Sequence, residues 1–249
     1  MIELLAALLG GAAGAIAGSF LATLILRWPD GRGIAKGRSA CDRCGRTLAA
    51  IDLIPIVSAL AARGRCRTCS GRIDPLHSQV ETTCAFIGAL ALGLMPGVEG
   101  LGWALFGWIG LTLAILDWRH FWLPDALTLP LALLGLTIGP WVTHVAVEDA
   151  FIGAAAGYLA LLMVALSYRL IRRRDGLGLG DAKLFGALGG WFGWQALPLI
   201  LLFAASLGLV AVLAAMAKGH ALDQRSKLPL GTCLILAAAP GWWVSALLY

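Results

Sequence analysis

Two aspartates border apolar segments of this chain, at positions where a carboxylate is costly. Asp181 follows the glycine-rich stretch GLGLG and opens the apolar segment AKLFGALGGWFGW. Asp117 closes another apolar segment, GLTLAIL, at a helix end where the macrodipole disfavours an anion. If the two carboxyls meet in a partly desolvated site, they share a proton, so that one deprotonates a water while the other donates to a carbonyl oxygen. This chemistry hydrolyses a peptide bond without a metal or a covalent intermediate.

Simpler roles exist for the acidic residues at helix starts. Asp181 has the position of a helix N-cap, and so does Asp125, which follows Pro124. Asp117 and Asp181 lie 64 positions apart (181 minus 117), a separation that permits contact without requiring it. The sequence contains no serine nucleophile elbow, no His-Glu-x-x-His motif and no P-loop. The acid pair is therefore the candidate catalytic site, and its convergence in space is an expectation.

Four of the six cysteines form two Cys-x2-Cys pairs, CDRC and CRTC, with 21 residues between them. This spacing is typical of a structural tetrathiolate zinc site with the ligands Cys41, Cys44, Cys66 and Cys69. The neighbouring arginines are expected to keep the thiolates ionised: Arg43, Arg46, Arg65 and Arg67. Free thiols and disulfides are the alternatives, and a reducing cytosol disfavours disulfides. Cys84 and Cys233 are expected to be small, buried apolar residues.

Membrane helices must position these residues. The 249 residues are 59% hydrophobic and 13% charged, with a mean hydropathy of +0.84, which is typical of polytopic membrane proteins rather than soluble domains. We predict an all-α membrane protein with about eight transmembrane helices, near residues 4–26, 82–97, 101–117, 126–146, 150–170, 182–196, 197–217 and 229–248. The first segment lacks a cleavage site and is expected to be retained rather than removed as a signal peptide.

The distribution of charge predicts the orientation of these helices. With both termini outside, all 19 Lys and Arg fall in cytoplasmic loops or at their edges. The net charge of +5 therefore reflects topology and does not indicate nucleic-acid binding. The predicted domains are a first helix at 1–26, a cytosolic zinc-ribbon-like insert at 27–80, and a helical bundle at 81–249 that carries the acid pair.

The acid motifs, the cysteine pairs and two further segments occur in an order that matches a known family. GLGLGDAKLFGALGGWFGW resembles a GxGD signature, and DWRHFWLPDALTLP resembles a motif that carries a first catalytic aspartate. GSFLATLILRWP resembles an N-terminal motif, and LPLGTCL resembles a C-terminal one. Together with a cytosolic four-cysteine domain, these motifs resemble those of the type IV prepilin peptidases, the aspartic leader peptidases of pilus and type II secretion systems.

This resemblance implies that Asp117 and Asp181 are the catalytic pair of an endopeptidase in the bacterial inner membrane, with both termini in the periplasm. The implied partners are the lipid bilayer and prepilin or pseudopilin substrates, whose short basic leader ends in glycine before an apolar helix. Family members often methylate the new N-terminus with S-adenosylmethionine, a task associated with the cysteine insert. Asp125 and Asp175 are expected to attract the basic leader.

Two other classes of function stay open. One is a non-catalytic membrane scaffold, stabilised by zinc, in which both aspartates cap helices. The other is a transporter, although the acids cluster at one boundary and the chain shows no matching halves. Glu81 is expected either to pair with an insert arginine or to lie near a methylation site. Lys183, close to Asp181, either biases the protonation of the acid pair or extends to the membrane interface.

Overall fold

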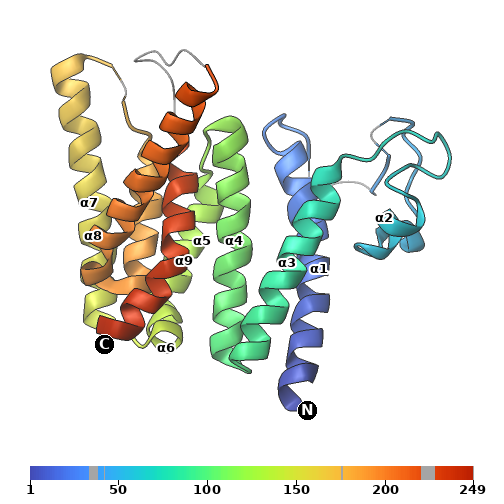
Figure 1. Ribbon diagram of the computed structural model, residues 1–249, viewed down its shortest axis with the longest axis horizontal. Helices are drawn as coiled ribbons and strands as arrows, with labels where there is room; N and C mark the ends of the chain where they lie inside the picture. Colours follow the sequence, from blue (N-terminus) through green and yellow to red (C-terminus); the bar gives the residue numbers. More distant parts are fainter. Residues whose placement is uncertain (34–38, 42, 175, 220–227, 249) are drawn as a thin grey trace. The chain divides into compact units, whose positions relative to one another are not determined.

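The computed structural model describes residues 1–33, 39–41, 43–174, 176–219 and 228–248, and over these residues the fold is helical (Figure 1). The elements are α1 (Ile2–Arg27), η1 (Ala50–Leu53), α2 (Val57–Ala61), α3 (Pro75–Leu94), α4 (Val98–His120), α5 (Asp125–Thr137), α6 (Gly139–Thr143), α7 (Val147–Arg172), α8 (Leu179–Ala217) and α9 (Leu230–Leu248). In these segments the β-type pairing is limited to two isolated bridges, so the all-α prediction is confirmed.

Four helices of the described segments are long and apolar enough to cross a membrane: α1, α4, α7 and α8. Helix α5 and the first part of α9 are apolar but shorter. The total of about eight transmembrane helices therefore stays a prediction.

Helix α8 contains two of the predicted spans, 182–196 and 197–217. Its backbone leaves the helical conformation at Gly193, where φ is 73° and ψ is 169°. A straight helix of its 39 residues would be about 58 Å long, against a hydrocarbon core of about 30 Å. The kink at Gly193 thus divides α8 into two arms close to the predicted division.

The predicted span 126–146 does not form one helix. Helix α5 ends at Thr137 and α6 begins at Gly139. Pro140, near the start of α6, lacks the N–H that would continue the helix, and its ring is incompatible with a helical carbonyl four residues earlier. The break lets Gly139 approach α8, because a Cβ at Gly139 would lie 3.2 Å from the Gly190 carbonyl oxygen.

The described chain divides into two compact units, Met1–Trp108 and Ile109–Tyr249, and each is considered by itself. In the first unit α1 and α3 pack side by side (Figure 1) through three glycines of α1 spaced four residues apart: Gly10, Gly14 and Gly18. A Cβ at Gly18 would lie 2.7 Å from the Glu81 Cα, so glycine is needed for this approach of the two backbones.

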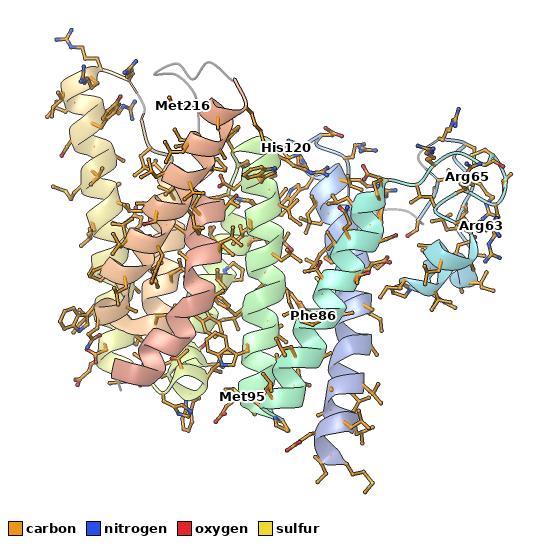
Figure 2. All side chains as sticks on the ribbon, in the orientation of Figure 1. Arg63, Arg65, Phe86, Met95, His120 and Met216 are labelled. Carbon is orange, nitrogen blue, oxygen red and sulfur yellow. The ribbon has the colours of Figure 1, made fainter. Side chains whose placement is uncertain are left out.

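Helix α3 continues from the cysteine insert without a break in the chain. It begins at Pro75, and the Asp74 side chain caps it by accepting a hydrogen bond from the Leu76 N–H at 2.8 Å. Figure 2 shows Phe86 partway along α3 and Met95 just beyond its end. Cys84 is buried in this helix, as expected for a small apolar residue.

The second unit is built around the first arm of α8. Nearly every residue from Ala182 to Gly193 is buried, and α8 contacts α5, α7 and α9. The Trp191 indole N–H donates to the Leu131 carbonyl oxygen of α5 at 2.9 Å. Because this arm is enclosed by three helices, its first turn, which carries Asp181, has a fixed place in the unit.

The contact between α7 and α8 depends on a pair of glycines and gives a first prediction. A Cβ at Gly189 would overlap the carbonyl group of Gly153, which is backbone and cannot rotate away. Gly189→Ala is therefore expected to destabilise the protein by about 1–3 kcal/mol, the usual cost of overpacking. The measurement is the thermal unfolding midpoint of the purified protein in detergent, followed by tryptophan fluorescence.

Gly208→Ala, in the second arm of the same helix, is the matched control, because no described atom lies within 4 Å of a Cβ added there. This variant is expected to unfold at the wild-type temperature. Equal midpoints for all three proteins would mean that α7 and α8 do not approach this closely.

Candidate functional site

Asp117 is buried where the last turn of α4 meets the first turn of α9. Only 5% of the surface of Asp117 is exposed to solvent. The Oδ2 atom accepts a hydrogen bond from the Thr232 backbone N–H at 2.7 Å and another from the Thr232 Oγ1 at 3.1 Å. An aspartate at the unfavourable end of its own helix thus lies at the favourable, N-terminal end of another.

Asp181 lies in the first turn of α8. The N-cap of this helix is Gly178, so the expectation that Asp181 is an N-cap is wrong. One carboxylate oxygen, Oδ2, lies beside Gly178, 3.1 Å from where a Cβ would be. The other, Oδ1, is buried and has no hydrogen-bond partner among the described residues. A buried acceptor without a partner is costly in a protein interior, and a bound water or substrate group would satisfy it.

The structure brings the segments that carry the two aspartates together. Leu123 contacts both Gly231, which lies beside Asp117, and Gly180, which precedes Asp181. A Cβ at Gly231 would lie 3.1 Å from Asp117 Oδ2 and 2.8 Å from a Leu123 methyl, so a side chain there would crowd the site. Asp117 and Asp181 therefore lie in one region of the second unit, and their convergence on one water stays a prediction.

The segment between α4 and α5 lines the same site. Leu123 contacts both glycines that flank the acids, since a Cβ at Gly180 would lie 2.9 Å from its own Cβ. Two glycines therefore leave room for one leucine. Its packing fixes the spacing between the first turn of α8 and the first turn of α9.

Lys183 and Asp125 form an ion pair that ties α8 to the start of α5. The Lys183 Nζ lies 2.6 Å from Oδ1 and 2.7 Å from Oδ2 of Asp125. Asp125 is the first residue of α5 and Pro124 is the N-cap, so the N-cap expectation for Asp125 is wrong. Because the charge of Asp125 is matched by Lys183, its attraction for a basic leader is reduced. Asp175 lies outside the described residues.

The four predicted metal ligands also come together, in the first unit. The Sγ atoms of Cys41, Cys44, Cys66 and Cys69 all lie within 4.8 Å of one another. Four sulfurs at about 2.3 Å from a tetrahedral zinc ion would be about 3.8 Å apart, so the cluster has the size of a single-ion site. All six cysteines are free thiols, which removes the disulfide alternative in this structure. The cluster can bind a metal.

The two cysteine turns have the same backbone hydrogen bonds. Cys41 donates to Arg46 and Cys66 donates to Gly71, each at 2.9 Å. In return, Gly45 donates to Cys41 and Ser70 donates to Cys66, again at 2.9 Å. The residue after each second cysteine has positive φ, 71° for Gly45 and 53° for Ser70. Such repetition indicates two equivalent knuckles that each present a pair of sulfurs.

Backbone N–H groups favour the thiolate form of Cys66, whereas burial raises the pKa of Cys44 to about 11. The N–H groups of Cys69 and Thr68 lower the pKa of Cys66 to about 6. Arg46 and Arg67 both pair with Asp52, and a role of the arginines in keeping the thiolates ionised stays a prediction. Figure 2 shows Arg63 and Arg65 on the same insert. Arg46 and Arg67 thus form ion pairs within the insert.

Glu81 connects the insert to α3 in a way that the sequence did not indicate. Its Oε2 accepts a hydrogen bond from the Ile56 backbone N–H at 2.8 Å, so the expected arginine partner is replaced by a backbone group. Ile56 has a φ of 63°, a conformation that is uncommon for a β-branched residue. A buried carboxylate therefore holds a strained turn of the insert against α3.

Sequence reasoning missed Thr232 and Gly231 as parts of the acid site. Both lie in LPLGTCL, at the start of the last apolar segment. A small polar residue after a glycine at such a position was the available signal, because the first turn of a helix has free N–H groups. Nothing in the local pattern identified Asp117, 115 positions earlier, as the acceptor.

Comparisons with known proteins give two family matches, one mostly within each of the two compact units. Residues 103–213 match the type IV leader peptidase family, and residues 12–94 match the bacterial peptidase A24 N-terminal domain. No solved structure matches the chain.

Several curated relatives share one name, Prepilin leader peptidase/N-methyltransferase. The protein from Burkholderia pseudomallei (strain 1026b) is 40% identical over 204 residues, which cover 81% of this chain and 65% of that protein. Those from Aeromonas salmonicida (strain A449) and Dickeya chrysanthemi are 37% and 38% identical, over 82% and 90% of this chain and 69% and 77% of their own lengths. The chain thus spans slightly less than two thirds of the Burkholderia relative. These relatives and the four apolar helices identify an integral membrane protein.

Proposed function

The chain belongs to the type IV leader peptidase family, and we propose that it is an aspartic endopeptidase that removes the leader from prepilins or pseudopilins. Asp117 and Asp181 are the catalytic pair of this proposal. The observations that support it are the placement of both acids around Gly231 and Leu123, and a buried Asp181 oxygen that has no hydrogen-bond partner among the described residues. Two such carboxyls are the full set of groups that aspartyl hydrolysis requires.

The reaction follows from two carboxyls that share one proton. The ionised carboxylate takes a proton from a water, whose oxygen attacks the carbon of the scissile carbonyl group. The protonated carboxyl gives its proton to the carbonyl oxygen, so the intermediate is a neutral diol. When the C–N bond breaks, the carboxyl that took the proton from water gives it to the leaving nitrogen, and a diol hydroxyl returns its proton to the other carboxylate as the carbonyl group of the leader's new carboxyl forms. The pair ends with the one proton with which it began.

The substrate suits a membrane site of this kind. A prepilin has a short basic leader ending in glycine, followed by an apolar helix that can lie beside the apolar helices of the peptidase. The positive-inside pattern supports an orientation with both termini in the periplasm of a bacterial inner membrane, and with the acid pair at the cytoplasmic boundary. Cleavage then takes place where the substrate helix leaves the bilayer on the cytoplasmic side.

The cysteine insert is proposed to be a structural zinc site on the cytoplasmic side. Cys41, Cys44, Cys66 and Cys69 would hold one ion, which stabilises a small loop-rich domain by cross-linking two distant turns. Four thiolates fill a tetrahedral coordination sphere and leave no open position for a substrate water. In this proposal the metal supports the insert, and hydrolysis is left to the acid pair.

Methylation of the new N-terminus is the second proposed activity. The relatives carry N-methyltransferase in their names, and the match to their N-terminal domain covers residues 12–94, which include the insert. S-adenosylmethionine would supply the methyl group, and the free amine of the mature pilin would accept it.

The scaffold alternative has one observation in its favour and is tested by the same experiment. Because Asp117 caps the first turn of α9, a purely structural role would explain its burial. That role requires an acceptor oxygen, which asparagine also provides. Catalysis requires an ionisable group, which asparagine does not provide.

Replacement of either acid by asparagine is the main test of the peptidase proposal. Asp117→Asn and Asp181→Asn are each expected to lower the rate of leader removal by about 10²–10⁴-fold, because one member of the proton-sharing pair is lost. The assay uses purified full-length protein in detergent and a synthetic peptide with a lysine-rich leader, a glycine and an apolar segment. Product is measured by mass spectrometry.

Asp149→Asn is the matched control, because Asp149 is an acid near the kink of α8 that bonds the Trp194 indole N–H at 2.8 Å. This variant is expected to cleave at the wild-type rate. Wild-type activity in either dyad variant, with normal accumulation in the membrane, would favour the scaffold.

Metal analysis tests the zinc proposal. The purified wild-type protein is expected to contain about one zinc per chain, and Cys66→Ser is expected to lose most of it because one of four ligands is replaced by a weaker one. Cys84→Ala is the control, since Cys84 is buried in α3 and is not part of the cluster. Elemental analysis after chelator-free purification gives the ratio. A metal-free wild type that is stable and active would contradict the proposal.

The methylation proposal is tested on the mature peptide after cleavage. With S-adenosylmethionine present, the product is expected to gain the mass of one methyl group at its N-terminus, and without it the product stays unmodified. Tandem mass spectrometry locates the modification. Complete cleavage without any methylated product, over several peptide sequences, would remove the second activity and leave the first intact.

A further inference from the structure

Thr232 makes three polar contacts that join α9 to the end of α4. Its backbone N–H donates to Asp117 Oδ2 at 2.7 Å. Its Oγ1 lies 3.1 Å from the same oxygen and 2.9 Å from the Ala114 carbonyl oxygen, one turn earlier in α4. The residue is 8% exposed. A buried hydroxyl therefore has two acceptors within reach, although it carries one proton.

This geometry serves both protonation states of Asp117. When the carboxyl is ionised, the hydroxyl proton can point at Oδ2, so that Oδ2 accepts from both the N–H and the O–H of Thr232. When Oδ1 takes a proton from the water that it faces, Oδ2 becomes a carbonyl oxygen and still accepts from the Thr232 N–H. The hydroxyl proton can then stay on Oδ2 or point at the Ala114 carbonyl oxygen, so rotation of one hydroxyl is enough to adapt to the change of charge. The carboxyl keeps a partner in each state and does not have to rotate.

We propose that Thr232 is a positioning residue of the acid pair, which holds Asp117 Oδ2 through both protonation states so that Oδ1 faces the reacting water. This inference rests on the proposed peptidase function. The bonds from Thr232 to Asp117 all use Oδ2, which leaves Oδ1 as the oxygen for catalysis. A catalytic carboxyl that gains and loses a proton in each turnover needs such a partner if it is to stay in one orientation.

The N-terminus of α9 provides the hydrogen-bond donor to Asp117 that cannot rotate, the Thr232 backbone N–H. The backbone N–H of Thr232 belongs to the first turn of a 19-residue helix, where N–H groups have no partner within the helix. It therefore cannot rotate away when the carboxyl changes its protonation state. The Thr232 hydroxyl is the second donor, and it can rotate between Asp117 Oδ2 and the Ala114 carbonyl oxygen. Substitutions at residue 232 can separate the two, because valine removes the hydroxyl and keeps the N–H.

Thr232→Val is the test, with cleavage of the synthetic leader peptide measured in full-length protein in detergent. We expect kcat to fall by about 10- to 100-fold, as for loss of one hydrogen bond to a charged group, while KM changes little because no substrate contact is removed. Thr232→Ser is expected to restore most of kcat, since it returns the hydroxyl without the methyl group.

Thr143→Val is the matched control for removal of a buried threonine hydroxyl. The Thr143 hydroxyl donates only to the Gly139 carbonyl oxygen within α6, at 2.9 Å, and this variant is expected to keep the wild-type kcat. If Thr232→Val fails to accumulate in the membrane, Thr232→Ala is assayed with the same expectation. Failure of both to fold would overturn the positioning role, because Thr232 would then be needed for the fold itself.

The outcomes separate this inference from the function on which it rests. An active wild type with an equally active Thr232→Val overturns the positioning role and leaves the peptidase proposal standing. Equal loss in Thr232→Val and Thr232→Ser also overturns it, since the hydroxyl would not be the group that matters. A wild type that fails to cut the peptide, under conditions in which the Dickeya chrysanthemi relative cuts it, overturns the peptidase proposal.

Discussion

The second unit depends on one carboxylate placed between two helix ends. Asp117 is in the last turn of α4, where the partial negative charge of the helix end is unfavourable, but its oxygen accepts from the first turn of α9, where the partial charge is positive. The second contact offsets the first only while α9 keeps this position. Burial of Asp117 and docking of α9 are therefore one structural requirement, and the same contact places Gly231 beside Asp117 Oδ2.

Glycine contacts allow the rest of the unit to meet this requirement. In a membrane, apolar side chains gain little by leaving lipid for protein, so helices associate through close packing and polar contacts. Gly153 and Gly189 bring the backbones of α7 and α8 into contact, and Gly135 makes room for the Trp191 indole. These contacts enclose the first arm of α8 on several sides. The depth of Asp181 follows from that packing and from its contacts with Gly178, while its Oδ1 has no partner in the described chain.

The sequence could predict those features of the fold that depend on the local pattern of residues. Hydropathy predicted helices, and Cys-x2-Cys spacing predicted the sulfur cluster, because each knuckle is formed by neighbours in the chain. The contacts of Thr232 with Asp117, of Lys183 with Asp125 and of Glu81 with Ile56 join distant residues, and no spacing rule indicates them. For the same reason Asp125 and Asp181 looked like helix caps. Proline and glycine mark a helix start, but they do not decide which residue becomes the cap.

The chemistry of the two sites explains why a chain with a metal-binding cluster would still hydrolyse peptides with carboxyls. A metal activates water only where a coordination position is open, and four sulfur ligands around one ion close every position. A filled zinc site would therefore supply no catalytic group for hydrolysis. The insert is attached to α3 by the bond from Ile56 to Glu81, and to α1 by a bond from the Arg27 guanidinium to the Ala40 carbonyl oxygen. A change in the cysteine knuckles would reach these two helices through both attachments, as a change in packing.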